Sequence, residues 1–327
     1  MKACAPGKLI LSGEHSVVYG APAIAVAVDR QVTASFLADD SGLLTISSDL
    51  LGEQVFQLSD LEYCRDQADR RFKLFEQGKL RITDVLSSPF DLMAYVLVQA
   101  GFSGSGHLQL RSDIPAGAGM GSSAAVIAAL LRLSEATPMP QQDFFRLVRY
   151  CERLQHGRGS AIDAAAVTLG GLVKIEGEQL QPLNLQLDHR WYIWDSGQPE
   201  STTGETVAEV RKHFHKSSIW QQFADVTEKL IFALQEAKSS VAGLIQQNQQ
   251  LLLEIGVVPA AVQHKIDQLQ RLGASAKVCG AGAISGEQGG QVLVYLPDNN
   301  PEEISTEMQA TLQCLQQAKR GASRVND

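Results

Sequence analysis

The stretch that most constrains this chain is Pro115-Ala116-Gly117-Ala118-Gly119-Met120-Gly121-Ser122-Ser123-Ala124-Ala125. Its proline and three glycines exclude a helix up to Gly121. From Ser122 onward the residues are mostly small and apolar, which predicts a buried helix over residues 122–135. A strand-like run over residues 106–112 precedes the loop. The sequence therefore predicts a strand, a glycine-rich loop and a helix N-terminus in succession.

A unit of this kind is suited to bind an anion. Bare backbone N–H groups of the loop and the positive end of the helix dipole both face whatever the loop encloses. The loop differs from the common P-loop, because no Gly-Lys followed by serine or threonine closes it. Taken alone, the stretch is equally compatible with an ordinary tight turn capped by serine.

Composition limits the class of protein and its partners. A chain of 327 residues can bury a large core and is expected to form two domains. A net charge of −8 argues against nucleic acid or an anionic membrane as a general partner, but a local cationic pocket can still hold a small anionic substrate. Five scattered cysteines without a C-x-x-C pair indicate reduced thiols. With no signal-peptide pattern and no apolar run of about 18 residues, we expect a cytoplasmic protein.

Hydrophobic periodicity predicts an early part rich in strands and a later part rich in helices. Strands are predicted over residues 8–12, 23–38, 43–48, 53–58, 106–112, 172–175, 191–194, 275–279 and 291–296. Helices are predicted over residues 91–99, 122–135, 141–155, 160–169, 206–213, 220–237, 239–254, 259–272 and 301–319. A loop-like stretch near residues 180–190 predicts domains over 1–185 and 186–327, the second α+β. The tail 320–327 is expected to be frayed.

Three polar residues near the N-terminus are candidates for a phosphate site. Lys8 stands between Gly7 and an apolar strand, where it could point into a cleft or simply into solvent at a strand end. Glu14 and His15 lie in a short segment that two glycines bracket. They could contact a ligand or form an ordinary polar turn.

Two carboxylates further along carry more information. Glu152 borders the apolar stripe of the predicted helix 141–155, and Asp163 lies in the first turn of a helix of small residues. A carboxylate in such surroundings needs a partner, because burying it unpaired is costly. The Gly157-Arg158-Gly159 break lets the chain reverse, so the two carboxylates could converge. Alternatively, Asp163 only interacts with the dipole of a helix whose expected N-cap is Ser160, a contribution of about 0.3–1 kcal/mol.

A second glycine-rich run, residues 279–290, lies between two predicted strands. It could be a long hairpin loop without a ligand. It could also pack against the first glycine-rich loop and help to close a site.

Together these stretches resemble the GHMP kinases, and most closely the mevalonate kinase branch of that family. Three family motifs occur in the right order, at residues 5–20, 115–125 and 280–290. Between the second and the third, Glu152 and Asp163 match the metal carboxylate and the catalytic aspartate of the family. Asp195-Ser196-Gly197 with Ser201-Thr202-Thr203 resembles its substrate-side strand and threonine. The resemblance spans nearly the whole chain.

The resemblance implies a fold, an activity and a set of site residues. The fold would be α+β with two domains, an N-terminal ribosomal protein S5 domain 2-like α/β domain and a C-terminal ferredoxin-like α+β domain. The activity would be ATP- and Mg²⁺-dependent phosphorylation of the 5-hydroxyl of mevalonate. The ATP phosphates would be held by Pro115, Gly117, Ala118, Gly119, Met120, Gly121, Ser122 and Ser123.

The resemblance also assigns the remaining roles. Asp163 would be the general base, with Lys8 beside it, while Ser123 and Glu152 would bind Mg²⁺. The substrate side would be formed by Lys8, Glu14, His15, Thr202, Thr203 and Gly280. The protein is expected to bind no nucleic acid and no membrane, and the sequence leaves a homodimer open.

The chain departs from the family in the third motif, where residues 283–288 replace a tight run of glycines and add a charge. This departure leaves open a sister kinase that acts on phosphomevalonate or on another small sugar or hydroxy acid. An alternative of another class is a non-catalytic sensor of nucleotide or metabolite. The presence of both Asp163 and Lys8 argues against it, because a sensor needs neither.

Overall fold

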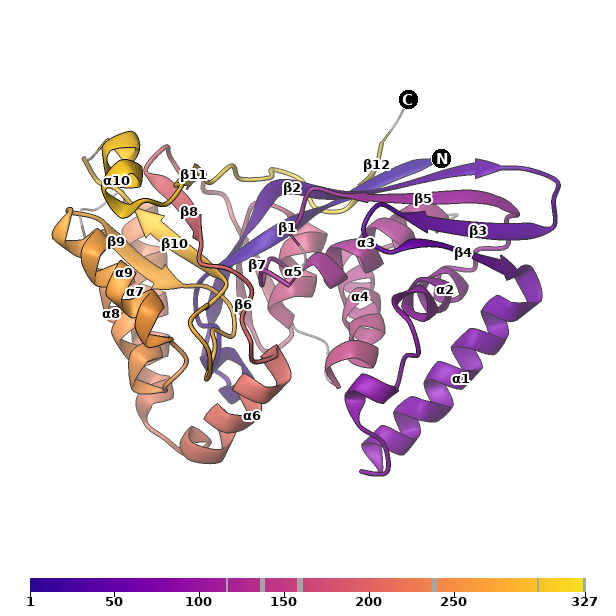
Figure 1. Ribbon diagram of the computed structural model, residues 1–327, viewed down its shortest axis with the longest axis horizontal. Helices are drawn as coiled ribbons and strands as arrows, with labels where there is room; N and C mark the ends of the chain where they lie inside the picture. The colour runs from indigo at the N-terminus through magenta and orange to yellow at the C-terminus, as the bar shows by residue number, and fades with distance from the viewer. Residues whose placement is uncertain (116, 136–138, 158–160, 237–239, 299, 326–327) are drawn as a thin grey trace.

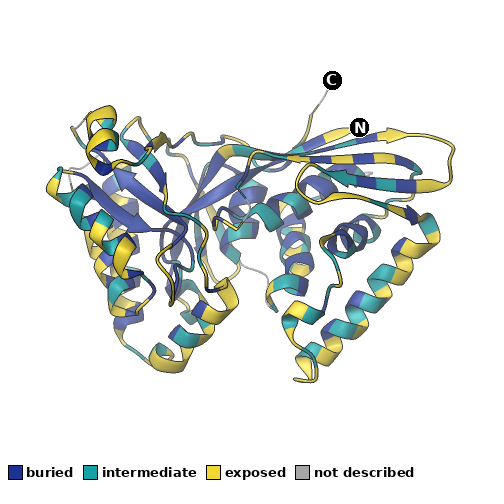
Figure 2. Cartoon of the chain, in the orientation of Figure 1, coloured by how far each residue is buried: buried dark blue, intermediate teal, exposed yellow. Residues whose placement is uncertain are grey.

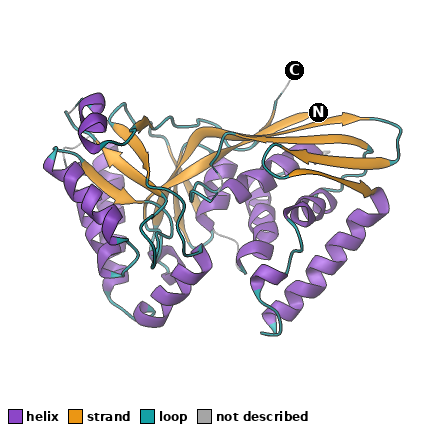
Figure 3. Ribbon diagram, viewed as in Figure 1, coloured by secondary structure: helices purple, strands orange, loops and turns teal. Residues whose placement is uncertain are grey.

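The computed structural model describes residues 1–115, 117–135, 139–157, 161–236, 240–298 and 300–325. Two β-sheets with helices packed against them build an elongated molecule (Figure 1). Figure 3 shows how the larger sheet runs along one side while most helices of the N-terminal half lie beneath it. Within the described part of the chain, no helix has the length and apolar composition needed to cross a membrane.

The larger sheet has eight strands among the described residues, most of them from the first half of the chain. These strands are β1 (Lys2–Ser12), β2 (Ala23–Ala38), β3 (Leu43–Ser48), β4 (Gly52–Gln57), β5 (Gly106–Ser112), β6 (Leu172–Glu176), β7 (Gln179–Leu183) and β12 (Ser323–Arg324). Their order is β12-β1-β2-β5-β3-β4, and β6 pairs with both β2 and β7. All neighbours are antiparallel except β3 and β5, which are parallel.

Most helices of the first half pack beneath this sheet. They are α1 (Leu58–Glu76), α2 (Pro89–Gln99), α3 (Ser122–Ser134), α4 (Gln141–His156) and α5 (Ala161–Leu169), with short 3₁₀ turns η1 (Ser16–Tyr19) and η2 (Ile82–Asp84). Ser88 caps α2 by accepting a hydrogen bond from the Asp91 amide, and Pro89 occupies the first turn, where a missing N–H costs nothing. Helix α3 is buried over most of its length because it lies between the sheet and α4.

The smaller sheet forms the core of the second half (Figure 1). Its strands are β8 (Trp191–Asp195), β9 (Ser275–Val278), β10 (Gln291–Tyr295) and β11 (Gln313–Cys314), in the antiparallel order β11-β8-β10-β9. The accompanying helices are α6 (Thr203–Phe214), α7 (Ile219–Gln235), α8 (Val241–Glu254), α9 (Ala260–Arg271) and α10 (Pro301–Met308).

Strand β2 joins the two halves. Along residues 32–36 buried and half-buried side chains alternate, the period-two pattern of a strand with one face on the core. Residues 23–28 are buried throughout, because α3, α5 and α7 all contact this strand. The uninterrupted dark blue of this region in Figure 2 marks the centre of the molecule.

Most predicted elements are confirmed, several of them residue for residue, such as 23–38, 43–48 and 106–112. The first strand begins at Lys2 rather than at residue 8. Helix α1 was missed, because its wide spacing of buried positions, Leu61, Ala68 and Phe72, gives a weak apolar stripe. Strand β7 occupies the start of the stretch expected to be a loop. Ser160 and the Arg158-Gly159 break lie outside the described residues, as does Ala116.

Two expectations about the C-terminus are wrong. The helix predicted over residues 301–319 ends at Met308, where Gln309 adopts a left-handed conformation with φ of 51°. The tail is not frayed over its described part. The Ala322 amide donates to the Val167 carbonyl at 2.7 Å, and Arg324 pairs with Ala3 across β12 and β1. The end of the chain thus returns to the first sheet. We retain the division at residues 185 and 186 as a proposal.

The packing of the C-terminal segment against α5 makes the size of residue 321 important for stability. A β-carbon on Gly321 would lie 2.0 Å from the Thr168 carbonyl oxygen, so Gly321→Ala must push the C-terminal segment away from α5. We expect a loss of about 1–3 kcal/mol of folding free energy, the usual cost of overpacking, measured by thermal and urea unfolding. The control is Gly204→Ala in α6, where nothing lies within 4 Å and the melting temperature should hold or rise. Equal melting temperatures for the two variants would contradict the close packing of the tail.

Candidate active site

Lys8 lies at the centre of the candidate site, on β1. Its backbone amide donates to the Met120 carbonyl at 2.9 Å, and its Nζ donates to the Gly119 carbonyl at 2.7 Å. The same ammonium lies 3.0 Å from Oδ1 of Asp163, at the start of α5. The Lys8 side chain is 4% exposed and that of Asp163 is 20% exposed. Lys8 is therefore not a solvated strand-end lysine, and Asp163 does more than interact with a helix dipole.

The glycine-rich loop wraps around this lysine. Gly117, Gly119 and Gly121 have φ values of 70°, 73° and 69°, a region that other residues rarely adopt. A β-carbon on Gly121 would also lie 2.9 Å from Cγ of Lys8, so the close approach requires glycine. The N-cap position of α3 is Gly121, and no side chain in the described part of the chain caps the helix. The expected alternative of a serine cap is thus wrong, and the first N–H groups of α3 are available to an anion.

Ser123 of α3 contacts α4 one turn from Glu152. The Ser123 hydroxyl donates to Oε1 of Gln155, and Glu152 lies three residues earlier on the same face of α4. Glu152 is 1% exposed. A serine whose proton is donated to Gln155 keeps its lone pairs for a cation, and oxygen donors suit Mg²⁺.

The donor set matches a Mg²⁺ ion that is also bound by phosphates. Among the described residues, no group of three or more histidines, cysteines and carboxylates gathers to hold a metal. Mg²⁺ in phosphate sites needs only one or two protein ligands beside phosphate oxygens and water. Glu152 and Ser123 therefore fit this ion.

His156 is a site residue that the sequence reasoning missed. It ends α4, seven residues before Asp163. Its side chain is exposed at the surface, yet the surrounding protein desolvates it and lowers its pKa; the nearby Asp163 raises that pKa and Lys8 lowers it again. The signal that could have revealed it is its place in the same short segment as both carboxylates.

Glu14 and His15 are fixed by partners from the second half of the chain. Glu14 forms an ion pair with Lys277 of β9, and neither side chain is more than 1% exposed. Nε2 of His15 lies 3.0 Å from the Ala281 carbonyl. Burial lowers the pKa of His15 to about 4. The hydrogen bond to Ala281 raises this pKa, and the charge of Lys277 lowers it further. The ring is therefore neutral near pH 7, and its Nε2–H donates to that carbonyl.

The second glycine-rich run packs against the first. A β-carbon on Gly119 would lie 3.8 Å from the Cys279 carbonyl oxygen, and one on Gly280 would lie 3.9 Å from the Gly119 carbonyl oxygen. The Ser196 hydroxyl donates to the Gly290 carbonyl at 2.7 Å, and the Ile284 amide donates to the Ser201 hydroxyl at 3.1 Å. The alternative of an independent hairpin loop is wrong, because all three motifs meet.

The two threonines expected on the substrate side lie at the start of α6. The Thr202 hydroxyl accepts from the Glu205 amide at 3.3 Å and donates to Oε2 of Glu205 at 2.8 Å, so it caps the helix. Thr203 is the first helical residue, and both side chains are exposed. Their neighbour Ser201 is buried and reaches the third motif.

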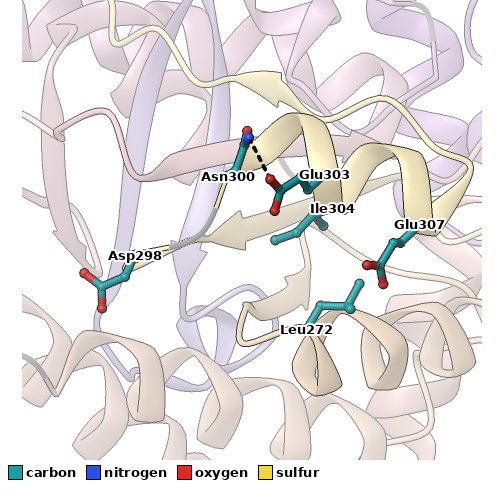
Figure 4. A pocket seen from close by; sticks show the side chains of 6 residues that line it. All are labelled: Leu272, Asp298, Asn300, Glu303, Ile304 and Glu307. Atoms are coloured by element: carbon teal, nitrogen blue, oxygen red, sulfur yellow. Dashed lines mark hydrogen bonds between the residues drawn. The ribbon is translucent and has the colours of Figure 1, made fainter.

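A separate cavity of about 440 Å³ lies between the end of α9 and α10 (Figure 4). It is lined by Leu272, Asp298, Asn300, Glu303, Ile304 and Glu307. It contains none of the residues described above, and its three carboxylates make it unsuited to a phosphate.

Comparison with known proteins agrees with this arrangement. Residues 90–171 match the family described as GHMP kinases N terminal domain. The chain is 30% identical over 298 residues to the mevalonate kinase of Archaeoglobus fulgidus, covering 86% of this chain and 89% of the relative. It is 31% identical over 325 residues to the mevalonate kinase of Thermococcus sibiricus, covering 93% and 91%. A crystal structure of mevalonate kinase aligns with a TM-score of 0.78 at 18% identity, over 98% of this chain and 100% of its own.

Identity at this level, over most of both chains, goes beyond a shared fold. The matched family segment contains the glycine-rich loop at residues 115–125, Glu152 and Asp163, while the matches to the two archaeal relatives extend well beyond it. The protein therefore belongs to the GHMP kinase family, within its mevalonate kinase branch.

Proposed function

We propose that this kinase transfers the γ-phosphoryl group of ATP to the 5-hydroxyl of mevalonate. The observation that carries the proposal is the Lys8–Asp163 pair, held at 3.0 Å within a loop suited to phosphates. Relatives at about 30% identity are named mevalonate kinases, which supports mevalonate as the acceptor. Free cysteines throughout the chain support a cytoplasmic location.

Asp163 is the general base in this proposal. Its carboxylate accepts the proton of the acceptor hydroxyl as the oxygen attacks the γ-phosphorus, and the bond from that phosphorus to the β–γ bridging oxygen breaks to release ADP. Lys8 keeps Asp163 in place and stabilises the negative charge that develops on the transferred group. The Lys8–Gly119 hydrogen bond fixes this pair relative to the phosphate loop.

The phosphate loop and the first turn of α3 hold the ATP phosphates with backbone N–H groups. Ser123 and Glu152 would hold Mg²⁺, which neutralises phosphate charge when bound. On the acceptor side we retain Glu14, His15, Thr202, Thr203 and Gly280. Because His15 is neutral near pH 7, we expect it to contribute hydrogen bonding or shape rather than a positive charge.

The third motif favours a second candidate acceptor. Residues 283–288 differ from the glycine run typical of the family and include Glu287. A loop of altered shape and charge near the transferred phosphate could select phosphomevalonate, or another small hydroxy acid or sugar.

The acceptor is tested by measuring ADP release with mevalonate, phosphomevalonate, homoserine and galactose. We expect turnover with mevalonate at a kcat/KM well above that for the other three. A higher kcat/KM for another acceptor would replace mevalonate but keep the kinase mechanism. ATP binding without turnover of any acceptor would instead favour a nucleotide sensor.

Asp163→Asn keeps the shape of the side chain but removes its basicity. We expect kcat to fall by about 10²–10⁴, the usual contribution of a general base, while ATP still binds. The control is Asp225→Asn, an exposed aspartate of α7 that pairs with Gln221. A rate near that of the wild type for Asp163→Asn would show that another group takes the proton.

Ser123→Ala removes one proposed Mg²⁺ ligand and the donor to Gln155. We expect half-maximal activity to require a higher Mg²⁺ concentration, measured by titration at saturating ATP. Ser134→Ala, at the other end of α3, is the matched control. Coinciding Mg²⁺ titration curves for Ser123→Ala and the wild type would rule out metal binding by this hydroxyl.

A further inference from the structure

Lys277 occupies a position that none of the three motifs explains. It lies within β9, a strand whose four residues are all buried, and its side chain is 0% exposed. Its ammonium forms the ion pair with Glu14 and also donates to the Ile10 carbonyl at 3.3 Å. The pair therefore joins the second half of the chain to the first motif in a region without solvent.

Stability alone does not account for this pair. Taking two charges out of water costs more than their attraction returns unless the geometry is excellent, and well-packed apolar residues often serve as well. Oε2 of Glu14 is buried and accepts no hydrogen bond within the described part of the chain. A pair that leaves one carboxylate oxygen unsatisfied is poorly optimised for stability. A role in positioning explains its presence better.

Other contacts cross between the same two segments. The His15 ring donates to the Ala281 carbonyl at 3.0 Å, and Sγ of Cys279 donates to the Ile10 carbonyl at 3.3 Å. A β-carbon on Gly13 would lie 2.6 Å from backbone atoms of residues 22 and 23, so the turn is also confined from behind. The turn at residues 13–15 and the segment 277–281 are thus held as one unit.

This unit reaches the catalytic pair through the backbone. Cys279 and Gly280 adjoin Gly119, and the Gly119 carbonyl accepts from Nζ of Lys8. A continuous series of contacts therefore runs from Lys277 to Asp163. Movement of β9 or of the loop that follows it would displace Gly119 and Lys8, and with them the place where the transferred phosphate and the acceptor must meet.

We propose that Lys277 is a positioning residue, which through its ion pair with Glu14 locks the first motif to the third glycine-rich run and so fixes the geometry for phosphoryl transfer. Within the described residues, the hydrogen bonds and the ion pair of Lys277 go to Ile10 and Glu14 and to no residue of the proposed ATP site or of the Lys8–Asp163 pair. The effect of Lys277 on phosphoryl transfer rests on the proposed function. Its effect on the loop over residues 279–284, which the ion pair holds in place, is independent of that function.

The test is a double-mutant cycle of Glu14→Gln, Lys277→Met and the two combined. Lys277→Met leaves a buried carboxylate unpaired, so its melting temperature falls; the double variant removes both charges and regains most of that stability. We expect Lys277→Met, which leaves the acceptor-side Glu14 in place, and the double variant both to show kcat about ten- to a hundredfold below the wild type, because misplaced reacting groups cost this much. The KM of both variants for ATP should change little.

The matched control is Lys174→Met. This lysine pairs with Glu228 and likewise joins the two halves of the molecule, but away from the motifs. The Lys174→Met variant should be less stable than the wild type, with an unchanged kcat. If the Glu14–Lys277 double variant recovers both melting temperature and kcat, the pair is only structural and the proposal is wrong.

Hydrogen–deuterium exchange without any substrate separates this proposal from the proposed function. The amides of residues 279–284 should exchange faster in Lys277→Met than in the wild type. If Lys277→Met does not fold, the milder Lys277→Gln takes its place. Unchanged exchange would show that the ion pair does not hold this loop in place. A wild-type protein that fails to phosphorylate mevalonate would refute the acceptor assignment, while the exchange result would still decide the role of Lys277.

Discussion

The site depends on the way one lysine of a central strand is held. Lys8 binds two successive carbonyls of the phosphate loop, those of Met120 through its amide and Gly119 through its ammonium, and meets Asp163 with the same ammonium. Because Lys8 pairs with Ala27 of β2 inside the sheet, these contacts cannot shift without disturbing the sheet. The phosphate loop therefore takes its position from the core rather than from its own flexible glycines.

The protein handles an anionic cofactor although its own net charge is −8. Among the described residues near the glycine-rich loop, the favourable groups are backbone N–H groups, the start of α3 and the Lys8 ammonium, all fixed before any ligand arrives. The second cation close to the motifs, Lys277, is neutralised by Glu14. Local arrangement thus outweighs overall charge, and it does so with few charged side chains.

Much of the fold and part of the site follow from local sequence. Periodicity and glycine are properties of neighbouring residues, so they could be recognised in the sequence alone. They predict strand 23–38, the loop at 115–125 and the helix that carries Asp163. The Glu14–Lys277 pair joins positions 263 residues apart, and the outer neighbour of β1 is β12 from the far end of the described chain, so neither contact leaves a local signal. Helix α1 and strand β7 were missed because surroundings rather than pattern stabilise them. His156 could have been predicted from its place in the short segment that carries both Glu152 and Asp163.

The pairing of β1 with β12 has a consequence for biosynthesis. Strand β1 acquires its outer neighbour β12 only after the ribosome has advanced the 319 residues from Cys4 to Ser323. Until then one edge of the nascent sheet is exposed, at the strand that carries Lys8, and unpaired edges invite association with other chains. Formation of such a long-range contact is slow. During this interval chaperone capture of the nascent chain competes with aggregation, and the interval ends only when β12 has been made and has paired with β1.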